Sequence, residues 1–308
     1  MSNIDPILLL SAIIIVSTPI LLAAIGELVV ERAGVLNLGV EGMMITGAVC
    51  GFVVATLSGS PWLGFAGAAL GGALLSMIFG ILTQLFLSNQ VATGLALTLF
   101  GLGLSALLGQ GYIGVKGPAV PDLYLPLLRD IPVLGPILFR HDIIVYLALA
   151  IVLGVWIFLN RTRAGRVLRA VGENHDAAHA LGYKVVRVRL MAIAFGGACA
   201  GLGGAYLSLV RVPQWTEGMT AGAGWIALAI VVFASWKPAR AVLGAYIFGG
   251  VTIAQLNLQA LGVAIESQYL SMTPYLVTIV VLVIISADKR RARMNAPACL
   301  GRPFFAAG

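Results

Sequence analysis

The sequence predicts an all-α polytopic membrane protein, and its composition carries that prediction. Hydrophobic residues make up 60% of the chain and charged residues only 10%, and there are 38 glycines. The mean hydropathy is +1.01. A water-soluble core of this size would need far more charge around it, whereas glycine-rich apolar segments are typical of membrane helices.

The individual elements follow from runs of about 17 to 25 uncharged residues, the length that crosses a bilayer. We expect about nine spans, within a range of eight to ten: 6–25, 43–57, 62–87, 91–108, 143–159, 190–210, 220–236, 241–258 and 270–287. The first follows Asp5 rather than a basic region and lacks a small-residue cleavage site, so we interpret it as a retained span. The second and the seventh are short or interrupted by glycine.

Basic residues predict the orientation, because loops rich in Lys and Arg face the cytoplasm. Alternating the nine spans puts 15 of the 19 Lys and Arg residues on one side, in 26–42, 88–90, 160–189, 237–240 and the tail 288–308. We therefore expect the N-terminus outside and the tail inside. The formal net charge of +7 reflects this topology, and a lipid bilayer rather than a nucleic acid is the expected partner.

Two parts of the chain resemble each other. Glu-Gly-Met stands at 41–43 and at 217–219, each time followed by Gly-Ala, and Pro61 with its downstream glycines matches Pro238 with its own. The halves 6–108 and 190–287 each hold four spans, and the segment 109–159 between them holds one more. Because the connecting segment crosses the membrane once, the second half is inverted relative to the first. We therefore expect one transmembrane domain built from inverted repeats around a substrate path.

The source of energy is inferred from what the predicted spans lack. None of the nine contains Asp, Glu, His, Lys or Arg, which ion-coupled carriers usually hold inside the membrane. The chain also has no GxxxxGK[ST] phosphate-binding loop. If the protein pumps a solute, a separate subunit must supply the energy.

The polar loop 160–189 is the obvious place for such a subunit to dock. Asn174 is placed to cap a short helix over 176–181, and Gly182 is placed to end it. A solvated basic loop that only sets topology is the simpler interpretation. His175 and His179 also have a spacing that can bind zinc on a helix, but no third ligand is nearby, so we expect no metal.

Four segments carry a family resemblance: ERAGVLNLGVEGMM (31–44), GENHDAAHALGYKV (172–185), GGACAGLGGAYLSL (196–209) and GWIALAIVVFASWKPARAVLGAYIFGG (224–250). They resemble permease subunits of ABC importers, in the ribose and branched-chain amino acid permease superfamily and its nucleoside or simple-sugar branch. The match covers about residues 6–288.

This resemblance implies a type II importer-like fold and a transport subunit that is not an enzyme. It implies ATPase subunits that bind ATP-Mg, a second permease that is a paralogue, and an extracytoplasmic substrate-binding protein. No cofactor is expected on this chain. The residues that the resemblance assigns to the ATPase-coupling element are Gly172, Glu173, Asn174, Ala177, Ala178 and Gly182.

Polar and aromatic side chains near the short spans are candidates for the substrate path. They are Asn37, Glu41, Thr46, Asn89, Gln90, Thr93, Trp215, Glu217 and Trp225, with Thr216 beside them. Such groups suit a neutral hydroxylated or planar solute, although hydrogen bonds between helices and interfacial tryptophans explain them equally well. We interpret Glu41 and Glu217 as helix-end or gate residues rather than ligands.

Three further hypotheses remain open on the sequence. The loop 111–141, with Asp122, Arg129 and Asp130 among its charges, is long enough to meet the binding protein or is merely a connection. A stand-alone channel or facilitator would also lack charged spans. An intramembrane enzyme using Ser105 is disfavoured, because every histidine lies in a loop. Cys50, Cys199 and Cys299 have no pairing pattern and are interpreted as unpaired.

Overall fold

The structure is a computed structural model that describes residues 6–121, 123, 131, 134–261, 267–287 and 295–305. Over these ranges it contains helices and two isolated bridges, which confirms the all-α prediction. The helices are α1 (Pro6–Arg32), α2 (Val40–Ser58), α3 (Pro61–Gln84), α4 (Gln90–Gly109), η1 (Gln110–Tyr112), α5 (Leu134–Leu138), α6 (Ile143–Arg161), α7 (Arg163–Glu173), α8 (His175–Ala180), α9 (Val185–Tyr206), η2 (Leu207–Arg211), α10 (Ala223–Phe233), α11 (Pro238–Ala260) and α12 (Ser267–Ala287). Asp122, Arg129 and Asp130 of the predicted outer loop lie outside the described residues, as do 288–294 and 306–308 of the tail.

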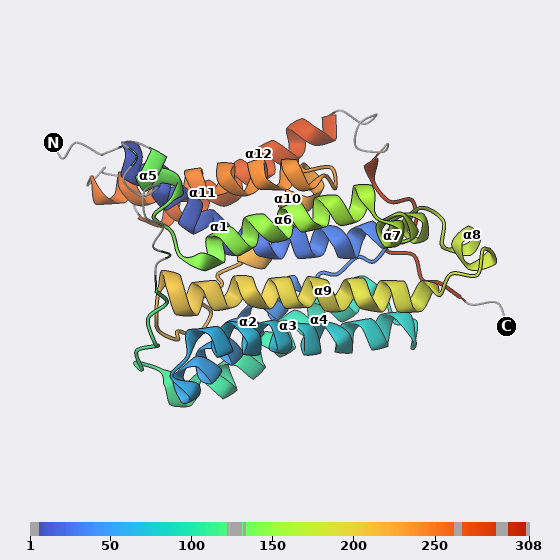
Figure 1. Ribbon diagram of the computed structural model, residues 1–308, viewed down its shortest axis with the longest axis horizontal. Helices are drawn as coiled ribbons and strands as arrows, with labels where there is room; N and C mark the ends of the chain where they lie inside the picture. The colour runs from blue at the N-terminus through green and yellow to red at the C-terminus, as the bar shows by residue number, and fades with distance from the viewer. Residues whose placement is uncertain are drawn as a thin grey trace.

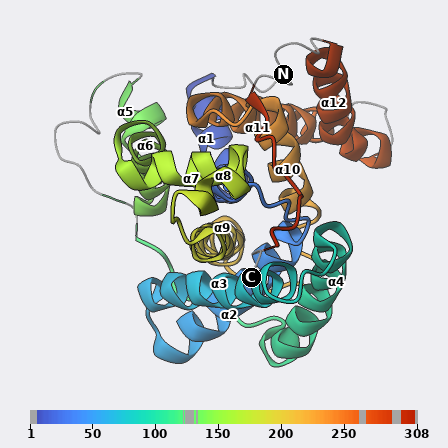
Figure 2. The same cartoon turned by 90° about the vertical axis from the view of Figure 1, so that its right-hand side faces the viewer.

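Two long helices, α1 and α9, form the centre of the bundle. They pack against each other, with α2 and α3 on one side and α10 and α11 on the other (Figure 2). The long helices lie side by side, and the short helices α7 and α8 project at one end, on the right of Figure 1. We call this the α8 end of the bundle and the other the opposite end.

The structure confirms a polytopic helical chain but not the count of about nine spans. Among the described residues, seven helices are long and apolar enough to cross a membrane: Pro6–Arg32, Val40–Ser58, Pro61–Gln84, Gln90–Tyr112, Ile143–Arg161, Val185–Arg211 and Pro238–Ala260. The span expected over 220–236 is reduced to the 11 residues of α10. The residues before α10 cannot continue a helix, because Gly218, Ala221 and Gly222 have positive φ angles of 68°, 45° and 83°.

The prediction that no span holds an ionisable side chain is wrong. The expected first span stopped at residue 25, but α1 continues to Arg32 and contains Glu27 and Glu31, both fully buried. Glu31 accepts a hydrogen bond from Trp236 Nε1 at 2.5 Å, and Glu27 accepts a longer one of 3.4 Å from Asn37. Hydrogen-bond partners on distant segments let these two carboxyl groups lie inside the helix bundle. The predicted lack of charged side chains in the spans therefore no longer supports the inference of a separate energy source.

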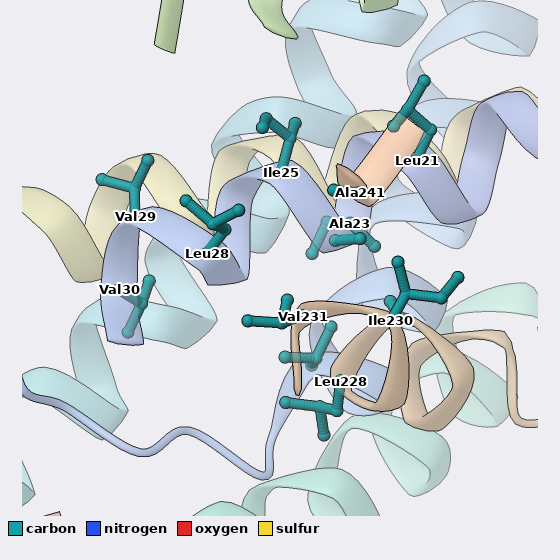
Figure 3. Packing of buried hydrophobic residues seen from close by; sticks show 14 of the residues in the cluster. Leu21, Ala23, Ile25, Leu28, Val29, Val30, Leu228, Ile230, Val231 and Ala241 are labelled. Atoms are coloured by element: carbon teal, nitrogen blue, oxygen red, sulfur yellow. The ribbon is translucent and has the colours of Figure 1, made fainter. Parts of the chain in front are cut away.

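The largest apolar cluster joins α1 to the short helix α10. The cluster includes Ala23 and Leu28 of α1, Ile230 and Val231 of α10, and Ala241 of α11, and the close view of Figure 3 shows the α10 side chains beside the stretch of α1 that carries Ala23. This packing holds an 11-residue helix that is too short to cross a membrane alone. It places the N-terminus of α10 deep in the bundle.

Small residues let α9 approach its neighbours closely. The α9 segment 196–205 reads GGACAGLGGA. A Cβ added at Gly204 would collide with the carbonyl oxygen of Met44 on α2, and one at Gly201 with that of Ala68 on α3. Close backbone approach of this kind is how helices associate inside a bilayer, where apolar burial gives no advantage over lipid.

Candidate functional site

The N-termini of α2 and α10 meet at a single carboxylate, Glu41. Its Oε1 accepts hydrogen bonds from Thr220 Oγ1 at 2.6 Å and from the Gly222 amide at 2.9 Å, and its Oε2 accepts one from the Gly224 amide at 2.6 Å. Only 4% of the Glu41 surface is exposed. A carboxylate suits this place, because the first amides of a helix lack partners and carry a partial positive charge.

Glu41 and Glu217, which occupy matching positions in the sequence repeat, have different surroundings. Glu41 is buried and caps α10, whereas Glu217 is exposed in the turn that precedes α10. The sequence pattern alone did not show which of the two would join the halves. The structure assigns the helix-end role to Glu41.

The turn between α1 and α2, residues 33–39, is fixed by side chains from α4 and from the turn itself. Gln90 Oε1 accepts a hydrogen bond from the Leu36 amide at 2.8 Å, and Thr98 Oγ1 donates one to the Leu38 carbonyl at 3.1 Å. Asn37 accepts one from the Gly39 amide at 2.9 Å. Asn37 and Gln90, two of the predicted path residues, thus hold the turn that leads to Glu41.

Beside this junction lies a cavity of about 380 Å³. It is bounded by α1, η2, the segment before α10, α10, α11 and α12. Its polar lining groups are Arg211, Thr216, Thr220, Thr252, Gln255 and Tyr275. Thr220 therefore faces the cavity and also donates to Glu41, which links the capped helix junction to the cavity wall.

The predicted path residues do not line this cavity. Asn37, Glu41, Thr46, Asn89, Gln90, Thr93, Trp215, Glu217 and Trp225 are all described, and none is among the cavity-lining residues. Asn89 caps α4 by accepting from the Ala92 amide, and Thr93 bonds to Ser88 at 2.9 Å. Trp215 is buried, with its indole against Gly109, and Thr46 is buried without a hydrogen-bond partner for its hydroxyl. Only Thr216, at the edge of the predicted group, reaches the wall.

Sequence reasoning missed Thr252, Gln255 and Tyr275. Thr252 and Gln255 lie in α11, and Tyr275 lies in α12. None of the three belongs to a local motif. The signal that could have identified them is their uncharged polar side chains, since a polar side chain within a membrane helix usually faces another helix or a cavity.

At the α8 end, the structure confirms the predicted caps of the short helix. Asn174 Oδ1 accepts a hydrogen bond from the Ala177 amide at 2.9 Å. Gly182, with φ of 86°, ends the helix, and the Tyr183 amide bonds back to the Ala178 carbonyl at 3.1 Å. The helix runs from His175 to Ala180, one residue earlier at each end than expected.

The six predicted coupling residues do not share one surface. Glu173, Asn174, Ala177 and Gly182 are exposed, whereas Gly172 and Ala178 are buried, with 2% of Ala178 accessible. A Cβ at Gly172 would collide with the Arg32 carbonyl. Gly172 and Ala178 therefore seat the element on the bundle, and Glu173 contacts the tail, because its Oε2 accepts a hydrogen bond from the Ala298 amide at 3.4 Å. We call the exposed positions Asn174, Ala177 and Gly182 the free face of α8.

The two imidazoles of α8 face an aromatic ring. His175 and His179 lie edge-on to Phe304, with ring centroids 5.4 and 5.3 Å away. His175 Nδ1 also lies 3.1 Å from Arg189 Nη2. Burial lowers the pKa of His175 below its ordinary value of 6.5, and the neighbouring Arg189 lowers it further. His175 is therefore neutral at physiological pH.

Comparison with known proteins adds an independent line of argument. A glucose ABC transporter permease from Haloferax volcanii, named TsgC13 and described as putative, is 40% identical over 95% of each chain. The nucleoside ABC transporter permease NupC of Lactococcus lactis is 34% identical, over 90% of this chain and 92% of its own. The guanosine ABC transporter permease NupQ of Bacillus subtilis is 31% identical, over 97% and 96%. No solved structure matches significantly.

A family model supports the same conclusion over most of the sequence. The model described as the branched-chain amino acid transport system / permease component matches residues 9–286. This range includes the Glu41 junction, the cavity and α8, but stops before the described tail segment 295–305. The chain is thus a membrane permease subunit of an ABC importer, not an enzyme, and it belongs to the branched-chain amino acid transport system / permease component family.

Proposed function

We propose that this permease carries a small, neutral, hydroxylated solute, a nucleoside or a simple sugar, through the cavity beside the Glu41 junction. The cavity is the observation that carries the proposal. Its volume of about 380 Å³ falls within the range of about 300–1,000 Å³ typical of small-molecule sites. Thr216, Thr252 and Gln255 offer hydrogen-bond partners for sugar hydroxyls, and Tyr275 offers an aromatic face.

The relatives support this choice of solute. Glucose, nucleoside and guanosine are the solutes in the names of the three permeases described above. All three classes carry hydroxyl groups and no net charge. An extracytoplasmic binding protein would deliver the solute to the opposite end of the bundle, and the cytoplasm would lie at the α8 end.

Pairwise packing supports the inverted-repeat, type II importer-like architecture. The helices α2 and α3 of the first half pack on α9, which begins the second half, while α10 and α11 of the second half pack on α1. In each half, therefore, the second and third helices pack on the first helix of the other half. A path between two such halves fits alternating access.

ATP-Mg would bind to separate ATPase subunits, and these would dock on the free face of α8. Asn174, Ala177 and Gly182 lie on that face, next to the exposed Leu181, and Glu173 lies just before it. A second permease, a paralogue as the family resemblance implies, would complete the transporter in the bacterial cytoplasmic membrane. The N-terminus would lie outside and the tail inside.

The experiment measures uptake of a labelled purine nucleoside by cells that express the complete transporter, with unlabelled ribose or glucose as competitor. Uptake that needs the ATPase and ignores both sugars supports a nucleoside, and uptake abolished by a sugar moves the solute to that class. If the purine nucleoside is not taken up and no other nucleoside or simple sugar is taken up in its place, the proposed solute range is wrong.

The role of α8 has its own variant. Because Ala177 is exposed and Ala178 is buried, Ala177→Arg alters the free face without disturbing the seat of the helix. We expect Ala177→Arg to abolish uptake while the chain still inserts, and Gly103→Ala, in open space on α4, to leave uptake unchanged. Full uptake by Ala177→Arg would contradict docking on α8, and uptake without any ATPase would indicate a facilitator.

A further inference from the structure

The described tail segment, residues 295–305, crosses the α8 end of the bundle, and we call it the C-terminal strap. Figures 1 and 2 show this red segment passing over the end that carries α7 and α8. The Cys299 amide donates to the Gly172 carbonyl at 2.9 Å, and the Gly301 amide donates to the Gly34 carbonyl at 3.1 Å. The strap therefore bridges the end of α7 and the turn between α1 and α2.

Phe304 anchors the strap to α8. Its side chain is 5% exposed and lies between His175 and His179 of that helix. Val171, Ala178 and Val185 complete a small apolar cluster around it. Burying an aromatic side chain removes its apolar surface from water and so stabilises the contact. A six-residue helix such as α8 has little stability of its own, so its position depends on this contact.

Arg189 contacts α8, the C-terminal strap and the α1–α2 turn. This residue of α9 is fully buried. Its guanidinium donates to the Ala33 carbonyl at 3.2 Å and to the Arg302 carbonyl at 3.1 Å, and it also lies 3.1 Å from the His175 ring nitrogen. One side chain thus holds the α1–α2 turn, the strap and α8. The rigid fork of a guanidinium suits a site with several fixed acceptors.

The α1–α2 turn leads directly to the substrate cavity. Glu41 follows Gly34 by seven residues. It accepts hydrogen bonds from amides at the start of α10 and from Thr220, which lines the cavity. A continuous series of contacts therefore joins α8, the strap, the turn at 33–39 and the cavity wall. Energetic coupling between distant sites needs such a packed series, and a measurement must show that it is used.

We propose that the C-terminal strap is part of the ATPase-coupling unit, with Phe304 as the positioning residue that makes α8 move together with the α1–α2 turn. The inference rests on the proposed docking of ATPases on α8. It goes beyond that proposal because the strap lies after residue 286, where the family match ends. The strap would transmit movement of α8 to Gly34 and so to the helix junction at Glu41.

The test compares Phe304→Ala with two controls in the full-length chain, assembled in its transporter. Phe304→Leu keeps an apolar side chain at the position. Phe305→Ala removes the same type of side chain from the next residue, which is 66% exposed. Hydrogen exchange over residues 174–184 reports how firmly α8 is held, and the uptake assay with ATP hydrolysis gives the amount of ATP used per solute molecule.

We expect Phe304→Ala to speed exchange over 174–184 at least about tenfold, the factor that corresponds to about 1.4 kcal/mol. ATP used per solute molecule should rise several-fold, while both controls stay near wild type. Unchanged exchange would overturn the anchoring role, and faster exchange with unchanged coupling would show that the strap only packs. If Ala177→Arg keeps full uptake while Phe304→Ala still loosens α8, the proposed docking on α8 fails and the anchoring contact stands.

Discussion

Glu41 is the single side chain on which the two halves of the permease depend most directly. Its carboxylate accepts three hydrogen bonds from the segment that begins α10. An amide at this position would turn its NH₂ group toward backbone donors. We expect Glu41→Gln to lower the free energy of unfolding by about 1.5–3 kcal/mol, the contribution of hydrogen bonds to charged groups. Uptake should fall at least about tenfold. Uptake and the abundance of the protein are measured in the same cells, so that uptake can be expressed per molecule of permease.

Glu217→Gln is the matched control for this variant. Glu217 occupies the corresponding position of the Glu-Gly-Met repeat, but it is exposed and makes no contact with the start of α10 comparable to that of Glu41. Its replacement should leave both melting temperature and uptake unchanged. Equal losses from the two variants would contradict the assignment of the helix-end role to Glu41 alone.

The low pKa of His175 makes the seat of α8 sensitive to pH. Burial and the nearby Arg189 and Arg302 oppose protonation, and Asp176 at 3.6 Å only partly offsets them. The unfolded segment therefore binds a proton at higher pH than the folded one. The stability of this contact is complete above about pH 6.5 and falls as the pH drops toward the lower, folded pKa.

Hydrogen exchange over residues 174–184, corrected for the intrinsic rate at each pH, measures this effect. Protection in the wild type should be lower at about pH 5.5 than at about pH 8. In His175→Asn, which cannot be protonated, protection should no longer depend on pH in this range. A wild-type segment with the same protection at both pH values would show that His175 does not control it.

At the scale of single elements, the sequence predicted the ends that local chemistry determines. Asn174 and Gly182 were identified as caps of α8. Pro61 and Pro238 were noticed only as matching positions of the repeat, and they prove to be the first residues of α3 and α11. The sequence did not predict helix ends that depend on contacts with residues far away in the chain. α1 extends past Glu27 because Asn37 and Trp236 supply hydrogen bonds from other segments, and no pattern within α1 reveals them.

The packing of α9 against α2 gives a prediction at the same scale. Gly204 faces the Met44 carbonyl with no room for a side chain. Gly204→Leu should therefore force the two helices apart and cost about 1–3 kcal/mol or more, as overpacking does. Thermal unfolding in detergent measures the loss. Gly154→Ala, where a Cβ meets open space on α6, should leave the melting temperature unchanged, and a similar loss there would indicate a general intolerance of helix glycines.

At the scale of the whole molecule, the sequence offered motifs that match between two segments but gave no indication of the cavity. The matched Glu-Gly-Met and proline motifs indicated which segments correspond. They did not indicate that α10 would be short, or that Thr252 and Tyr275 from separate helices would meet beside it. Thr252 and Tyr275 come together only when their helices pack, and the sequence of neither helix shows which segment the other will face.

The orientation of the whole bundle can be checked by thiol labelling in a background that lacks Cys50, Cys199 and Cys299. Gln255 lines the cavity and should face the outside, whereas Leu181, 77% exposed beside α8, should face the cytoplasm. A membrane-impermeant maleimide should label Gln255→Cys in intact cells, and the transported solute should slow that reaction because it occupies the cavity. Leu181→Cys should react only in inside-out vesicles. Labelling of Leu181→Cys from outside would reverse the proposed topology, and labelling of Gln255→Cys that ignores every transported solute would separate the cavity from the transport path.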